Sequence, residues 1–211
     1  MPLPLKLSTP LAWGRIVASC CLALALAACS ILPKQPVSQT ASASSQQRIQ
    51  TLAAVKQFSL EAKLAVQYNG KGYTARLDWQ HDGQEDHMRI FSPLGQQVAL
   101  IHRTANSVTL TDQAGKQHQA GDVASLTERL LGWRLPLAGL SQWILGIPHN
   151  ASPYQASYLP GGEPATLTQD DWRIEYDDYQ TASINGITAS LPYTTRLQQQ
   201  DVRLKLVIQH W

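Results

Sequence analysis

Residues 58–79 have the sequence FSLEAKLAVQYNGKGYTARLDW, which indicates the fold class most clearly. Apolar residues alternate with polar ones over residues 58–66 and again over residues 73–79. A period of two is typical of strands that have one buried and one solvated face. The connecting residues 69–72, NGKG, suit a tight turn. The stretch therefore predicts an antiparallel hairpin whose second strand points four side chains inward, Tyr73, Ala75, Leu77 and Trp79.

The same period of two continues on both sides of the hairpin and of a helical centre. Before that centre it predicts strands at residues 86–92, 97–102 and 106–111. After the centre it predicts strands at residues 154–159, 172–177, 186–191, 194–199 and 202–210. Because each connection is short, these strands are expected to form an antiparallel meander.

Three helices are predicted from apolar residues at helical spacing. The first covers residues 46–57; Asp122 caps the second, which Gly132 ends, and Pro136 begins the third, which residues 146–148 end. So long a sheet must curl or close, and its concave face can cover the apolar sides of the helices. The predicted fold is α+β, a curled, half-open antiparallel β-barrel of about ten or eleven strands with helices covering an apolar lumen.

The N-terminus has the pattern of a bacterial lipoprotein signal. Lys6 and Arg15 precede an uncharged run, residues 16–28, which ends in small residues. Residues 26–29, LAAC, fit a lipobox. We therefore expect a signal peptide at residues 1–28, lipid on Cys29, a flexible tether over residues 29–46, and one domain over residues 47–211. An ordinary signal peptide or an uncleaved anchor is the alternative. Ser30, in place of aspartate, favours the outer membrane of a Gram-negative cell.

Composition excludes several classes of partner. Without Lys6 and Arg15, the 17 basic residues fall to 15 and equal the 15 acidic ones, which argues against nucleic acid or an anionic surface as an electrostatic partner. Two of the three cysteines lie in the signal and Cys29 would carry lipid, so no disulfide can form within one chain. The fold must then rest on its apolar core. We expect a monomer without a cofactor.

Motifs for catalysis or metal binding are not found in the sequence. It has no Gly-x-Ser-x-Gly elbow, phosphate loop or dinucleotide fingerprint. The histidines lie mostly in turns or on polar strand faces without metal-ligand spacing, so no metal site is predicted. An acidic group could contain a catalytic pair, but its strand pattern favours a solvated face: Asp170, Asp171, Glu175, Asp177 and Asp178. The chain is predicted not to be an enzyme.

Two apolar features remain. Residues 133–146, WRLPLAGLSQWILG, are apolar on more than one helical face. Periodicity alone favours plain core, and the alternative is an apolar cavity with a mobile lid for acyl chains. Leu94 lies between Pro93 and Gly95 at a predicted hairpin tip, where polar residues are the norm. By itself such a leucine is more often a tucked-in turn residue than a functional one.

Besides the lipobox, a series of short segments is spread over nearly the whole chain after residue 28: residues 77–80 (LDWQ), 92–95 (SPLG), 131–133 (LGW), 135–137 (LPL), 140–146 (LSQWILG), 171–176 (DWRIEY) with Tyr179, 191–192 (LP), and 205–208 (KLVI) with Trp211. In their order and spacing, these segments resemble the LolB family, the outer-membrane lipoprotein receptors of the lipoprotein localisation pathway.

The resemblance implies a mechanism and a location. Such a protein takes lipoproteins from a soluble periplasmic carrier of similar fold, holds their acyl chains in an apolar cavity, and inserts them into the outer membrane without nucleotide or metal. It would be lipid-anchored at the periplasmic face. Pro93, Leu94 and Gly95 would form a loop that dips into the bilayer, where burial of a leucine contributes roughly 1.5–3 kcal/mol. The cavity and lid candidates are Trp79, Leu130, Trp133, Leu137, Leu140, Trp143, Ile144 and Trp172.

Two other functions stay open. One is a non-catalytic scaffold lipoprotein of an outer-membrane assembly complex, which would have a filled core and a protein partner. The other is a periplasmic lipid-acting hydrolase, for which the sequence offers no recognisable nucleophile and base. A connected apolar cavity beneath residues 133–144 would favour the receptor over the scaffold.

Overall fold

The computed structural model describes residues 40–211. The predicted signal peptide, Cys29 and Ser30 lie outside these residues. Within residues 40–211 no helix is both long and apolar enough to cross a membrane. The first described element is helix α2 (Ala43–Ala53), which starts before the predicted residue 46 and takes in the end of the predicted tether. The reason is a cap: the Ser42 hydroxyl accepts a hydrogen bond from the Ser45 backbone N–H.

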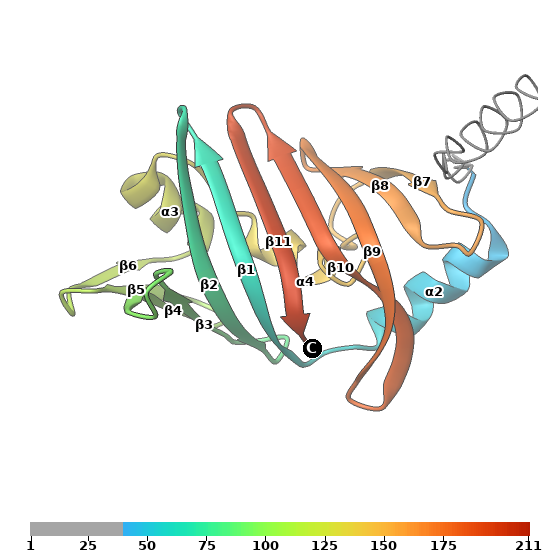
Figure 1. Cartoon of the computed structure of the whole chain (residues 1–211), viewed down its shortest axis with the longest axis horizontal. Helices are drawn as coiled ribbons and strands as arrows, with labels where there is room; N and C mark the ends of the chain where they lie inside the picture. Colours follow the sequence, from blue (N-terminus) through green and yellow to red (C-terminus); the bar gives the residue numbers. More distant parts are fainter. Residues whose placement is uncertain (1–39) are drawn as a thin grey trace, which may run out of the picture. The chain divides into compact units, whose positions relative to one another are not determined.

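A single antiparallel sheet of eleven strands forms the body, in the order β6-β5-β4-β3-β2-β1-β11-β10-β9-β8-β7 (Figure 1). The first and last strands are therefore neighbours, and β6 and β7 are unpaired edges, so the sheet is half-open as predicted. The strands are β1 (Phe58–Tyr68), β2 (Lys71–His81), β3 (Asp86–Phe91), β4 (Gln97–Arg103), β5 (Val108–Asp112), β6 (Gln117–Ala120), β7 (Tyr154–Tyr158), β8 (Pro164–Gln169), β9 (Trp172–Ile184), β10 (Ile187–Gln199) and β11 (Val202–His210).

The predicted hairpin is confirmed. Strands β1 and β2 pair from Phe58 opposite His81 to Tyr68 opposite Lys71. Strands β6 and β8 were not predicted, since neither has a clear alternation of apolar and polar residues. The short β6 has the sequence QHQA at the sheet edge, and β8 points the amide of Gln169 into the core.

The predicted break between residues 191 and 194 was wrong, because β10 runs through it as one strand. Pro192 has no backbone N–H to donate, which disfavours the middle of a sheet. At this position, however, β10 pairs only with β9, opposite Tyr179, and its pairing with β11 begins at Thr194. The proline is thus tolerated where one side of the strand is free.

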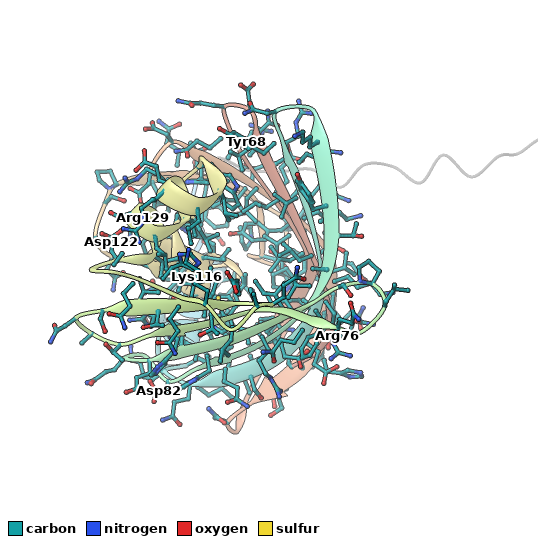
Figure 2. The ribbon with its side chains drawn as sticks, turned by 90° about the vertical axis from the view of Figure 1, so that its left-hand side faces the viewer. Tyr68, Arg76, Asp82, Lys116, Asp122 and Arg129 are labelled. Carbon is teal, nitrogen blue, oxygen red and sulfur yellow. The ribbon has the colours of Figure 1, made fainter. Side chains whose placement is uncertain are left out.

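Two helices lie against the concave side of the sheet (Figure 2). Helix α3 (Val123–Leu131) has the predicted caps: Asp122 accepts from the Ser125 N–H, and Gly132 ends the helix at φ +82°. Helix α4 (Leu137–Trp143) follows Pro136 and is shorter than predicted. The side chains that these helices bury belong to the same core as the inward faces of β1, β2, β9, β10 and β11.

One end of the concave face is open. Along β1 the inward residues pass from buried (Phe58, Leu60) to half-buried (Leu64, Val66). Opposite Val66, Tyr73 is 61% exposed, so its predicted inward position does not bury it. At the tip of this hairpin Tyr68 contacts Gly132 at the end of α3, and the inward side chains next to it are only partly covered. Together with Leu131 of α3, which is 50% exposed, these apolar side chains form a rim that we call the mouth: Leu64, Val66, Tyr73 and Leu131.

Candidate functional site

The predicted cavity and lid residues meet in one place. Six of the eight are fully buried in the common core: Trp79, Leu137, Leu140, Trp143, Ile144 and Trp172. Leu130 and Trp133 are partly buried and pack against the same core. Because strands and helices far apart in sequence contribute them, only the fold brings them together.

In this conformation the lumen is filled by the protein's own side chains. Leu137, Leu140 and Ile144 point into it and are each less than 5% exposed. A small enclosed space of about 10 Å³ lies between α2 and strands β7 and β8, next to Arg48 and Tyr158. It has room for one water molecule at most. This space is too small for an acyl chain, so uptake there would require a helix to move away from the sheet.

Helix α4 is held firmly in place. The Trp143 indole N–H donates to Gln169 Oε1 at 2.8 Å, and the amide of Gln169 in turn donates to the carbonyls of His149 and Ser152. Gly139 lies directly against the Trp143 ring, where a Cβ would come within 2.6 Å of a ring carbon. The tryptophan is thus fixed on both sides.

The segment after α4 is also tied to α2. Arg48, a half-buried residue of α2, donates to the Leu145 carbonyl at 3.0 Å and to the Ser190 carbonyl of β10. Its guanidinium lies over the ring of Tyr179, whose hydroxyl donates to the Pro164 carbonyl. Burial lowers the pKa of Arg48, although nearby Tyr179 partly offsets this effect. These bonds leave α4 little freedom to move alone.

Helix α3 is bonded to the sheet near its C-terminal end, and its Thr127 hydroxyl accepts a hydrogen bond from the Leu135 N–H at 2.8 Å. The Tyr68 hydroxyl, at the tip of the β1–β2 hairpin, donates to the Gly132 carbonyl at 2.9 Å, and Arg129 donates to the Gln119 carbonyl at 2.7 Å. Figure 2 shows Tyr68 above the helix on which Arg129 lies. Of the residues in α3, only Val123, Leu126 and Thr127 are buried. Three of the nine residues of α3 are buried, against five of the seven in α4, so lifting α3 would expose fewer buried residues.

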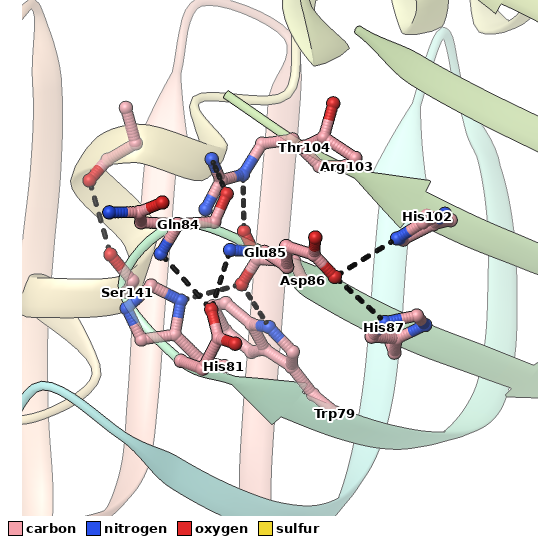
Figure 3. A network of polar contacts seen from close by, with 12 residues as sticks. Trp79, His81, Gln84, Glu85, Asp86, His87, His102, Arg103, Thr104 and Ser141 are labelled. Carbon is pink, nitrogen blue, oxygen red and sulfur yellow. Dashed lines mark hydrogen bonds and ion pairs between the residues drawn. The ribbon is translucent and has the colours of Figure 1, made fainter. Parts of the chain in front are cut away.

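A buried carboxylate supports the part of the core that contains Trp79 (Figure 3). Asp86 accepts from the Trp79 indole N–H at 2.7 Å, lies 2.7 Å from His81 Nδ1, and pairs with Arg103. Burial by itself would raise the pKa of Asp86, but the hydrogen bonds from these three side chains outweigh it and lower the pKa. Asp86 thus stays ionised and orients Trp79 in the wall of the lumen.

The residues that could hold a metal lie on the other face of the sheet. Potential ligand atoms of Glu85, His87 and His102 lie within 4.8 Å of one another, and the two imidazole rings stack (Figure 3). Sequence spacing did not reveal this cluster, because β3 and β4 each contribute one histidine. It lies opposite the face of Met88 and Ile101, away from the lumen.

The acidic group around β9 has the character of a solvated face. Asp177 pairs with Arg196 and Glu175 with Arg173, and all four side chains are largely exposed. Asp170 pairs with His149. Ion pairs thus engage three of the five carboxylates of this group, Asp170, Glu175 and Asp177.

Leu94 is not tucked in. It is 90% exposed at the tip of the β3–β4 connection, the most exposed large apolar side chain in residues 40–211. The turn is closed by the Gly95 N–H donating to the Ser92 carbonyl at 2.9 Å, and Gly95 takes φ +84°. At the base of this loop the Arg76 guanidinium stacks on the Phe91 ring. The loop thus presents one apolar side chain beside a cation.

Several contributing residues were missed from the sequence. Gln169, Asp86 and Tyr68 each hold an aromatic or helical part of the site by a hydrogen bond. One signal was available: Asp86 lies in phase with Met88 on the inward side of its strand, an unusual place for a charge. The bond of Tyr68 to Gly132 depends on the fold and has no local signal.

Comparison with known proteins identifies the family. A model described as "Outer membrane lipoprotein LolB" matches residues 56–211. The outer-membrane lipoprotein LolB of Chromobacterium violaceum is 35% identical over 159 residues, which cover 75% of this chain and 82% of that protein. The protein of the same name from Coxiella burnetii strain RSA 493 is 31% identical over 198 residues, covering 90% and 92%.

Solved structures of related shape have low sequence identity. A LolA superfamily protein from Nitrosomonas europaea is 8% identical, with a TM-score of 0.47 and coverage of 80% of this chain and 92% of that one. A putative outer membrane lipoprotein-sorting protein domain from Vibrio parahaemolyticus is 10% identical, with a TM-score of 0.49 and coverage of 79% and 88%. The family match spans most of the chain and agrees with its relatives, so this protein belongs to the LolB family of outer-membrane lipoproteins.

Proposed function

We propose that this protein accepts lipoproteins from a soluble periplasmic carrier of similar fold by enclosing their acyl chains in the lumen, and then inserts them into the outer membrane. As a member of the LolB family it is an outer-membrane lipoprotein of the lipoprotein localisation pathway. Uptake and insertion are non-covalent steps, so they need no catalytic residues.

The observation that supports this proposal most is that α3 and α4, the two helices that cover the lumen, are held differently. Helix α4 and the segment after it are fixed by the buried hydrogen bond of Trp143 and the part-buried one of Arg48, whereas the bonds of α3 to the sheet are exposed and lie near its C-terminal end. Lifting α3 would open the apolar interior at the mouth, where apolar side chains are already exposed. An acyl chain arriving there would replace contacts that the α3 side chains make in the closed state, so the exchange conserves buried apolar area.

Delivery would follow from an affinity difference and from Leu94. A receptor that binds acyl chains more tightly than the carrier draws cargo without an energy source. Leu94 would enter the bilayer interface, while Arg76 at the base of the same loop would lie at headgroup level. This arrangement orients the protein for release into the membrane.

Acyl-chain uptake is the first test. The mature chain with Cys29→Ala is mixed with a fluorescent fatty acid or with carrier loaded with a lipoprotein, and bound probe or cargo is measured. Val66→Glu places a charge in the mouth and is expected to reduce uptake about 10-fold or more, because a carboxylate is costly to bury there. Gln67→Glu, on the outer face of the same strand, is the matched control and should bind like the parent protein.

A scaffold role in an outer-membrane assembly complex is the second candidate, and the filled lumen is the observation that favours it. It predicts no uptake of acyl probes by the parent protein and no difference between Val66→Glu and Gln67→Glu. Uptake that depends on Val66 but not on Gln67 would exclude it.

A further inference from the structure

Two buried hydroxyl groups on the inner face of the sheet have no hydrogen-bond partner, and that of Tyr176 lies within electrostatic range of Arg48, Tyr158 and Tyr179. Tyr176 of β9 and Thr195 of β10 are directly paired across the two strands. Both belong to the inward faces that also carry Ile174 and Leu197. Tyr176 is 4% exposed and Thr195 0% exposed, so water does not reach them, and neither hydroxyl makes a hydrogen bond within residues 40–211.

Such groups are unusual in a core. A buried hydroxyl without a partner destabilises the folded state, whereas phenylalanine or valine of nearly the same shape would not. Other buried polar side chains of this core have partners: Gln169 uses its whole amide, and Ser157 bonds to Thr166 at 2.8 Å. Two other residues with such atoms have a partner, Asp78 in an ion pair with Arg76 and Ser152 beside Asp170. Arg48 and Trp211 lie outside the inward faces of β9 and β10.

The chemistry of the pair fits a neutral acceptor. Burial raises the pKa of Tyr176 well above its usual value, so this hydroxyl keeps its proton and can donate it. Thr195 offers a second donor from the adjacent strand. Apart from the hydrocarbon itself, a glycerol-linked acyl chain carries one polar group that could accompany it into a dry cavity, its ester. The ester carbonyl accepts hydrogen bonds and carries no charge.

We propose that Tyr176 and Thr195 form a subsite that donates hydrogen bonds to the ester carbonyl of glycerol-linked acyl chains bound in the lumen. This inference rests on the proposed function, because it requires that acyl chains enter. The subsite would fix how deep a chain goes and would favour acyl esters over bare hydrocarbon. Cargo lipoproteins and phospholipids share this ester, so the experiment below includes both sources.

The experiment compares an ester with its ether. The mature chain with Cys29→Ala is titrated with a dipalmitoylglyceryl-cysteine peptide and with the dialkyl ether analogue, which has the same chains but no carbonyl. The parent protein is expected to prefer the ester. Tyr176→Phe and Thr195→Val should each reduce that preference about 2- to 10-fold, the contribution of one hydrogen bond, and leave ether binding unchanged. Phosphatidylethanolamine and its ether analogue form the second arm, which shows whether phospholipid esters use the same subsite.

Thermal melting separates this role from a structural one. Tyr179→Phe is the matched control: it removes a hydroxyl that donates to the Pro164 carbonyl, and it should lower the melting temperature. Tyr176→Phe and Thr195→Val break no bond of the empty protein and should not lower it. Equal ester-to-ether ratios in the parent and both variants, for both lipid sources, would overturn the inference. Failure of the parent protein to bind ester or ether would instead refute the proposed function itself.

Discussion

Replacing Leu94 by serine tests how cargo leaves the protein. Leu94 is 90% exposed, so nearly its whole side chain is available for burial in a bilayer. Full burial of a leucine contributes roughly 1.5–3 kcal/mol, which corresponds to about a 10- to 160-fold change in partitioning of the loop. The loop turn itself depends on Gly95 and on backbone bonds, which the substitution leaves in place.

The assay measures two steps separately. Cargo uptake from the loaded carrier is followed with the unlipidated chain, and release is followed as transfer of cargo into liposomes. Leu94→Ser should leave uptake unchanged and slow the release about 10-fold or more. Leu131→Ser, which removes a half-exposed leucine at the mouth, is the control and should act on uptake instead. Equal loss of both steps in Leu94→Ser, or unimpaired release, would refute the proposed role of the loop.

Further predictions concern the helices and the Asp86 cluster. Tyr68→Phe removes the bond to the Gly132 carbonyl and should speed acyl-probe uptake about 2- to 10-fold in stopped-flow measurements; an unchanged rate would argue against lifting of α3. Gly139→Ala would place a Cβ 2.6 Å from the Trp143 ring and should lower the stability in denaturant by about 1–2 kcal/mol, whereas Gly72→Ala, where nothing lies within 4 Å, is its control; equal effects would contradict the packing argument. Asp86 has a lowered pKa in the folded protein, so its stabilisation is full above about pH 4, the unfolded value, and is lost as the pH falls through the folded pKa. Asp86→Asn should therefore be less stable at pH 7 by about 2 kcal/mol and lose less stability on acidification; parallel pH profiles for the two proteins would contradict this.

Local patterns predicted the parts of the fold that local physics determines. The alternation in β1 and β2 and the turn at residues 69–72 were sufficient for the hairpin, and Asp122 and Gly132 marked both ends of α3. Pro192 misled the prediction, because its tolerance depends on which neighbouring strand is absent at that position. Strand β8 was missed since its inward Gln169 interrupts the apolar pattern.

The eight residues predicted for a cavity and its lid lie in or against one core, and their contact with acyl chains stays a prediction. Whether they enclose a cavity or fill it depends on packing between distant elements, which periodicity does not report. The hydroxyls of Tyr176 and Thr195 were missed for a similar reason. The sequence shows that a polar group lies at an inward position of a strand, but only the three-dimensional structure shows that it has no hydrogen-bond partner.

We propose that cargo acyl chains enter the lumen beneath α3 and α4. The most direct measurement is photo-crosslinking of a lipoprotein whose acyl chain carries a diazirine, after transfer from the carrier, with the modified residues mapped by mass spectrometry. Adducts are expected on inward-facing residues such as Leu140, Ile174 and Leu206. Adducts confined to the outer face of the sheet, or no adducts despite completed delivery of cargo, would contradict it.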